Sequence, residues 1–177
     1  MTVSAEVKLL DQNTANQIAA GEVVEKPASV VKELVENALD AGAGKIDVTI
    51  FEGGTQYIRV ADDGSGMTEA NAKLAVLRHA TSKIRAAEDL MSLHTLGFRG
   101  EALPSIASVS NFQLLTRPAD EEFATSIRID GGEQTECQQT GGQAGTTVIV
   151  ENLFFNVPAR RKFLRTNATE GRYINEL

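Results

Sequence analysis

The sequence contains very few of the residues on which several common kinds of site depend. Among its 177 residues there is one cysteine, Cys137, and there are two histidines, His79 and His94. A single cysteine excludes an internal disulfide and fits a reducing compartment. These three residues do not favour a zinc site. Any metal is therefore expected to be a hard cation held by oxygen, with Mg²⁺ as the first candidate.

Long apolar runs and targeting segments are also missing. No apolar run approaches the roughly 20 residues that span a bilayer, and the start of the chain does not resemble a secretory or transit peptide. We therefore expect a cytoplasmic protein without membrane contact. The formal net charge of −7 does not favour the chain as a whole as a nucleic-acid-binding surface, although the local basic segment PARRKFLR can still contact phosphate.

The length and the hydrophobic content of 42% predict a single globular domain over residues 1–177. Helical patterns cover residues 11–24 (ending near Gly21), 27–42, 68–79, 101–109 and a segment that Asn156 caps and that starts near Pro158. Strand patterns cover residues 45–51, 56–62, 112–116, 124–130, 134–138 and 146–151. This order predicts an α+β fold, a two-layer sandwich with helices on one face of a mixed, mostly antiparallel sheet.

The predicted helix 27–42 has a polar stripe. At 100° per residue, one broad arc is apolar and the opposite side is polar. The apolar residues are Val30, Val31, Leu34, Val35, Ala38 and Leu39, and the polar ones are Glu33, Glu36, Asn37 and Asp40. Most acidic helix faces are simply solvated. Here, however, Lys32 is the only nearby base, and Glu33 and Asn37 lie one turn apart, so they can supply a general base and a Mg²⁺ ligand.

A glycine-rich stretch, ADDGSGM at residues 61–67, follows one predicted strand and precedes a helix. It contains Asp62, Gly64 and Gly66 in the pattern D-x-G-x-G. An aspartate before a glycine is common in ordinary turns. The alternative is functional: the Asp62 carboxylate can accept a hydrogen bond from a ring amine, and the glycines let the backbone approach that ring.

Residues 80–100 lack periodicity and end in GFRG, directly before a predicted helix. A loop of this length is usually functional or disordered. Backbone N–H groups at glycines that lead into a helix N-terminus favour an anion site. We therefore expect this segment to become ordered when nucleotide binds. The P-loop pattern, the dinucleotide pattern G-x-G-x-x-G and a Ser/His/Asp arrangement are all missing.

Four motifs together resemble those of the GHKL ATPases, the group of gyrase, sensor histidine kinases, the heat-shock chaperone and MutL. They are Glu33-x-x-x-Asn37, Asp62-x-Gly64-x-Gly66, Gly97-Phe-Arg-Gly100-Glu-Ala102 and Gly145-Thr146. The segments GEVVEKPASVVKELVENALDAGA, RHATSK and NVPARRKFL are similar to the MutL family of DNA mismatch repair proteins. This resemblance spans nearly the whole chain. It departs at Pro104, and at Asp63, where many members have Asn.

The resemblance implies the Bergerat fold, in which ATP lies between helices and sheet under a lid. It implies that Glu33 is the general base, that Asn37 ligates Mg²⁺ and that Asp62 reads adenine. It further implies that Gly64, Gly66 and Thr146 support the adenine contact, that Lys83, Gly97, Phe98, Arg99 and Gly100 close on the phosphates, and that Arg165 lines a DNA-contacting groove. Taken alone, Thr146 is equally well an ordinary strand residue, and Lys83 and Arg99 can be solvated charges.

The implied function is an ATP-hydrolysing switch domain in mismatch repair. Nucleotide closes the lid and promotes dimerisation of N-terminal regions, and the partners are a MutS-like mismatch sensor and a downstream nuclease or helicase, near the bacterial nucleoid. A following domain is expected to contact DNA and to supply a lysine to the γ-phosphate, so these 177 residues alone should be nearly inactive. A kinase of the same fold is an alternative that Glu33 disfavours, and a nucleotide-independent interaction module is another.

Overall fold

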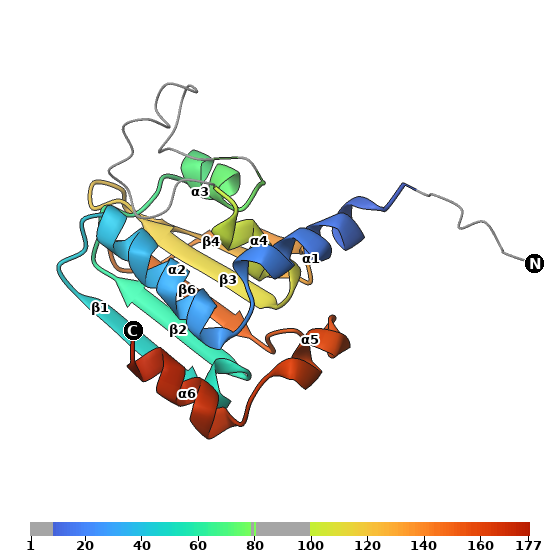
Figure 1. Cartoon of the computed structure of the whole chain (residues 1–177). Helices are drawn as coiled ribbons and strands as arrows, with labels where there is room; N and C mark the ends of the chain where they lie inside the picture. Colours follow the sequence, from blue (N-terminus) through green and yellow to red (C-terminus); the bar gives the residue numbers. More distant parts are fainter. Residues whose placement is uncertain (1–8, 79, 81–99) are drawn as a thin grey trace, which may run out of the picture.

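The computed structural model of the chain describes residues 9–78, 80 and 100–177 (Figure 1). Its strands form one six-stranded sheet in the order β1-β2-β6-β3-β4-β5, and every neighbouring pair is antiparallel. The strands are β1 Ile46–Phe51, β2 Tyr57–Asp62, β3 Asn111–Arg117, β4 Ala124–Asp130, β5 Glu133–Thr140 and β6 Gly145–Glu151. The predicted α+β class is confirmed, and the sheet is antiparallel rather than mixed across the described strands.

The helices lie on one side of this sheet (Figure 1). Their bounds are α1 Gln12–Val23, α2 Pro27–Asp40, α3 Glu69–Ala75, α4 Ala102–Ser108, α5 Pro158–Phe163 and α6 Asn167–Asn175, with a 3₁₀ turn η1 at Glu52–Gly54. Helix α2 packs on β2, α1 packs on α4, and α6 packs on α2 and η1. Among the described helices, none combines the length and the apolar character needed to cross a membrane.

The core lies between the sheet and the helices. Strand alternation turns one residue in two toward the helices, and these residues are buried: Ile58 and Val60 of β2, Val148 and Val150 of β6, Phe112 and Leu114 of β3, Ile127 and Ile129 of β4. From α2, Val30, Val31 and Leu34 close the layer and are at most 3% exposed. Burying each of these three side chains contributes roughly 1.5–3 kcal/mol, so α2 is fixed firmly on the sheet.

Helix α2 begins and ends as the sequence predicts. Pro27 is its first residue, and Gly42 has φ +72° just past its end. Leu39 is an exception to the predicted apolar arc, because it is 51% exposed. It lies beyond the side of the helix that the sheet covers.

Two predicted helix ends and one predicted cap are wrong. Helix α1 continues past Gly21 to Val23, and α3, which Thr68 caps as predicted, ends at Ala75 rather than near residue 79. Helix α5 does start at Pro158, but its N-cap is Val157 without a side-chain hydrogen bond. The predicted cap, Asn156, instead donates its side-chain amide to the carbonyl oxygen of Ser108 at 2.9 Å. A tertiary contact therefore takes the place of the local cap.

Candidate functional site

Asp62, Thr146 and Thr116 form a row of polar residues across three neighbouring strands. Asp62 pairs with Thr146 in the β2–β6 register, and Thr146 pairs with Thr116 in the β6–β3 register. All three lie on the helix-facing side of the sheet, because each is two residues along its strand from a buried core residue. These core residues are Val60 for Asp62, Val148 for Thr146 and Leu114 for Thr116. The apolar core thus ends in this polar row, directly below the C-terminal end of α2.

The Asp62 carboxylate is partly buried, and its oxygen Oδ1 accepts a hydrogen bond from the Gly64 N–H at 2.9 Å. Burial raises the pKa of Asp62 above its ordinary value, and the charge of Asp63 adds to the rise, although the N–H groups of Gly64 and Thr146 oppose it. Burial prevails because it disfavours the charged form. A partly desolvated acceptor at the edge of a core is suited to accept a hydrogen bond from a bound ring amine.

The loop between Asp62 and α3 is anchored on both sides. The Ser65 N–H donates to the carbonyl oxygen of Ala41 at 2.9 Å, and the Met67 N–H donates to the Thr116 hydroxyl at 2.9 Å. At Gly66, φ is +65°, and a Cβ would lie 2.1 Å from the Arg117 carbonyl oxygen. A side chain at position 66 is therefore excluded both by backbone conformation and by space.

Thr116 is a site residue that the sequence analysis missed. It is 1% exposed, and its hydroxyl lies 2.9 Å from the Thr146 hydroxyl, in addition to its contact with Met67. This hydroxyl pair joins strands β3 and β6 to the glycine-rich loop. The signal was present in the alternation Phe112, Leu114, Thr116, which ends a buried stripe in a polar residue.

Asp63 points away from the row. Its carboxylate accepts hydrogen bonds from the N–H groups of Gly44 and Lys45, both at 2.8 Å. The pKa of Asp63 is lowered, chiefly by the hydrogen bond from Lys45. The extra charge at this position therefore stabilises the turn between α2 and β1.

Glu33 and Asn37 lie on α2, one turn apart, and both are partly buried. The turn after Asn37 leads directly to Ala41, the residue that holds the glycine-rich loop. Within the part of the chain that the structure describes, no cluster of three or more His, Cys, Asp or Glu residues can hold a metal ion. Protein sites for Mg²⁺ often provide only one or two oxygen ligands and leave the rest to water and phosphate. The amide oxygen of Asn37 fits that kind of site.

The predicted phosphate-contacting segment falls mostly outside the described residues. Lys83, Gly97, Phe98 and Arg99 lie there, and only Gly100, with φ +63°, is described. Next to it, the Glu101 carboxylate accepts from Arg78, whose Nε lies at 2.8 Å and Nη2 at 2.7 Å. The Arg78 Nη1 also donates to the Asn16 side-chain oxygen at 2.9 Å. This junction of α1, the end of α3 and the start of α4 was not foreseen, because residues so far apart in sequence carry no local signal.

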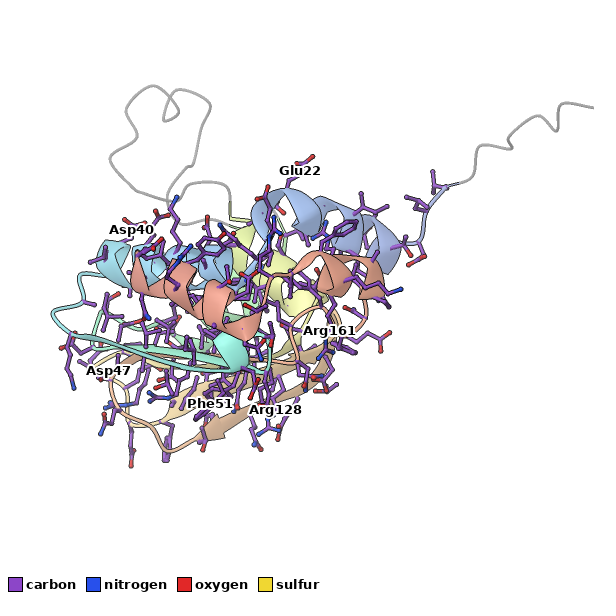
Figure 2. The ribbon with its side chains drawn as sticks, turned by 60° about the horizontal axis from the view of Figure 1, so that its bottom comes forward. Glu22, Asp40, Asp47, Phe51, Arg128 and Arg161 are labelled. Carbon is purple, nitrogen blue, oxygen red and sulfur yellow. The ribbon has the colours of Figure 1, made fainter. Side chains whose placement is uncertain are left out.

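Arg165 does not join the other predicted residues. It lines a groove of about 530 Å³ together with Glu52, Thr55, Gln56, Asn152, Arg161, Leu164 and Asn167. This groove lies where β2 begins and β6 ends, whereas Asp62 and Thr146 stand at the opposite ends of these strands. Figure 2 accordingly shows Asp40, at the end of α2, and Arg161 at opposite ends of the molecule.

Comparison with protein families places this geometry among known ATPases. Residues 25–144 match the family described as histidine kinase-, DNA gyrase B-, and HSP90-like ATPase. The chain is 62% identical, over 93% of its length, to the DNA mismatch repair protein MutL of Heliobacterium modesticaldum, of which it covers 25%. It is 60% identical, over 98% of its length, to MutL of Symbiobacterium thermophilum, of which it covers 27%. The chain thus spans about a quarter of the length of these relatives.

Two solved structures share the fold. The Aquifex aeolicus MutL ATPase domain complexed with ADP matches with a TM-score of 0.66 and 38% identity, covering 87% of this chain and 53% of the other. A crystal structure of the N-terminal domain of a DNA repair protein matches with a TM-score of 0.73 and 32% identity, covering 95% and 48%. Both matches include most of the sheet and the helices above it.

Proposed function

The chain belongs to the family of histidine kinase-, DNA gyrase B- and HSP90-like ATPases, and from this premise we propose that it binds and hydrolyses ATP as the ATPase unit of a MutL-like mismatch repair protein. The single observation that carries the proposal is the position of Asp62. Its partly buried carboxylate ends the core side of β2, beside a loop in which Gly66 leaves no room for a side chain. Such a site suits a flat base with an exocyclic amine.

In this proposal Asp62 accepts a hydrogen bond from the adenine amine. Gly64 and Gly66 let the loop backbone approach the base. The Thr116–Thr146 hydroxyl pair holds strands β3 and β6 together beneath the base. A site built to hydrogen-bond an amine strongly rejects a base that lacks one, because the partly buried carboxylate would then lose that hydrogen bond without regaining water. We therefore expect adenine nucleotides to bind much better than nucleotides of uracil.

For hydrolysis we propose that Glu33 accepts the proton of the attacking water. Its neighbour Asn37 would hold Mg²⁺ through the amide oxygen, and the ion would supply positive charge to the phosphates. The two side chains are one turn apart on a helix that is fixed by its buried face. Preorganisation of this kind is what positions a base for phosphoryl transfer. Lys83, Gly97, Phe98, Arg99 and Gly100 remain proposed phosphate contacts.

Titration calorimetry with a non-hydrolysable ATP analogue, with and without Mg²⁺, tests this function. Binding that Mg²⁺ strengthens is expected. A complete lack of binding would favour a nucleotide-independent interaction module. For the kinase alternative, ATP labelled on its γ-phosphate gives the answer, since a hydrolase releases the label as inorganic phosphate and a kinase leaves it on protein.

The role of the whole protein is also a proposal. We propose that nucleotide promotes dimerisation, that a MutS-like sensor and a downstream nuclease or helicase are partners in the bacterial cytoplasm, and that DNA is held mainly by a further domain. A lysine from that domain would complete the phosphate site, so almost undetectable turnover is expected from these residues alone and slow turnover from the protein that includes the further domain. Arg165 is the DNA contact that we propose within this chain.

A further inference from the structure

The groove that contains Arg165 has two arginines whose guanidinium groups form no ion pair with a carboxylate of the described residues. Arg161 and Arg165 are both exposed, and within residues 9–78, 80 and 100–177 no ion pair joins either guanidinium to an acid. The backbone beneath Arg165 is nevertheless fixed. Its N–H donates at 2.8 Å to the Glu170 carboxylate, which is 2% exposed. Two cations are thus presented from a rigid base toward an open groove.

One acid, Glu52, lines the same groove. It is held there on two sides. The Asn167 side-chain amide donates to its carboxylate, and Glu52 itself has φ +50° at the start of η1. The next residue, Gly53, packs so closely on Asn167 that a Cβ would lie 2.5 Å from the Asn167 carbonyl oxygen. The Glu52 carboxylate is therefore held at the wall of the groove when an anion approaches the arginines.

A fixed carboxylate beside two cations makes the affinity of the groove depend on how much charge an anion concentrates in one place. Both the attraction by the arginines and the repulsion by the carboxylate grow with the charge that an anion brings close. The carboxylate therefore reduces the advantage that the two arginines alone would give to a highly charged anion. A phosphodiester backbone brings one charge per residue, whereas a triphosphate concentrates about three to four charges in one place. Specificity of this kind comes from a repulsive element placed against the wrong ligand.

We propose that Glu52 is a specificity-determining residue of this groove, which weakens the binding of compact polyphosphates, such as free nucleoside triphosphates, more than the binding of a phosphodiester backbone. The proposal rests on the proposed contact of Arg165 with DNA. It gives a domain proposed to bind ATP at one end a means of weakening ATP binding in a second cationic groove at the other end.

The test compares Glu52→Gln with the parent chain. Glutamine keeps an oxygen that can accept the Asn167 amide, so the turn should remain folded, which circular dichroism checks. Glu133→Gln, on the edge strand β5 three strands from β6, removes the same charge outside the groove and serves as the control. Binding of a fluorescent single-stranded oligonucleotide is followed by anisotropy, and binding of inorganic tripolyphosphate by calorimetry, both at low ionic strength.

In Glu52→Gln, oligonucleotide affinity should rise about two- to threefold and tripolyphosphate affinity about tenfold, because the lost repulsion multiplies with ligand charge. The tripolyphosphate gain should disappear in the double variant Glu52→Gln/Arg165→Ala. Equal gains for both ligands, or no gain beyond that of Glu133→Gln, would overturn the role of Glu52. If Arg165→Ala leaves oligonucleotide affinity unchanged, the proposed DNA contact fails, while the tripolyphosphate measurement still decides whether Glu52 discriminates.

Discussion

The guanidinium of Arg160 lies where a side chain at Gly21 would have to be. A Cβ at Gly21 would come within 1.5 Å of the Arg160 Nη2, and Arg160 Nη1 donates to the carbonyl oxygen of Val24, at the end of α1, at 3.2 Å. This explains a glycine inside a helix, where it normally costs about 1 kcal/mol relative to alanine. Arg160 of α5 thereby closes the C-terminal end of α1.

We predict that Gly21→Ala has opposite effects on stability in two backgrounds. In the parent chain, alanine displaces the guanidinium and loses its hydrogen bond, a net destabilisation of about 1 kcal/mol. In the Arg160→Ala background that contact is already gone, so alanine should stabilise the fold by about 1 kcal/mol through helix propensity. Urea unfolding of the four chains measures both effects. The same sign in both backgrounds would contradict the contact.

A second double-variant cycle concerns Arg78 and Glu101. Their side chains are 20% and 14% exposed. Arg78→Ala removes the ion pair with Glu101 and one of the two hydrogen bonds that the Asn16 side-chain oxygen accepts, the other coming from Gln12. We expect a coupling free energy between Arg78 and Glu101 of about 1–3 kcal/mol in urea unfolding. The exposed pair Lys73–Glu69 is the control and should give no more than about 1 kcal/mol. Similar couplings for the two pairs would argue against a structural role for Arg78.

Asp62→Asn should abolish ATP binding without loss of the fold. A ligand at a hundred times its Kd raises the free energy of unfolding by about 2.7 kcal/mol, so the ATP-induced rise in Tm should disappear. Asp63→Asn is the matched control, since its carboxylate bonds to Gly44 and Lys45 and ATP binding should persist. An undiminished Tm shift in Asp62→Asn would remove Asp62 from the site.

The same variant should change how stability depends on pH. Burial raises the pKa of Asp62, so the ionised form is disfavoured in the folded state at neutral pH. Without nucleotide, Asp62→Asn should therefore be more stable than the parent at pH 7. That advantage should shrink as the pH falls through the raised pKa, because the parent then also becomes neutral. Urea unfolding between pH 7 and pH 4 measures the difference.

Glu33→Ala should bind ATP but not hydrolyse it. Loss of a general base typically lowers the rate by about 10²–10⁴-fold, while the contacts that bind the ground state persist. Glu36→Ala on the same helix is the control, because Glu36 pairs with Lys32 and turnover should be unaffected. Phosphate release is measured in the protein that includes the further domain, because these residues alone should be nearly inactive, and analogue binding is measured for each variant. Weaker binding with unchanged turnover per bound ATP would contradict the assignment.

Most of the local structure could be predicted from the sequence because its signals are local. Alternating residues define β2 and β4, and Pro27 and Gly42 mark the two ends of α2. Helix α1 was predicted too short because Gly21 was interpreted as a helix end. Its actual partner, Arg160, lies on a helix near the other end of the chain.

Relations between distant residues could not be predicted from local patterns. The pairing of Asp62 with Thr146 depends on strand order and register, which the hydrophobic alternation of a single strand does not determine. The alternation along β3 marks Thr116 as the polar end of a buried stripe, but its role in the site appears only once β3 is known to lie beside β6. The motifs identified the candidate site residues through family resemblance. The strand register explains why Asp62 and Thr146 lie side by side.

Strands β2 and β6 connect the Asp62 end of the molecule with the Arg165 groove, and their length determines how the two ends can influence each other. Six residues at about 3.3 Å each separate them by about 20 Å, more than twice the Debye length of about 8 Å at physiological salt. Charges bound at one end are therefore screened from the other. Both strands are also hydrogen-bonded on both sides, which prevents them from sliding past their neighbours. Anions at the two ends should consequently bind independently within this domain, and any coupling between them in the whole protein must arise from the movement of other parts.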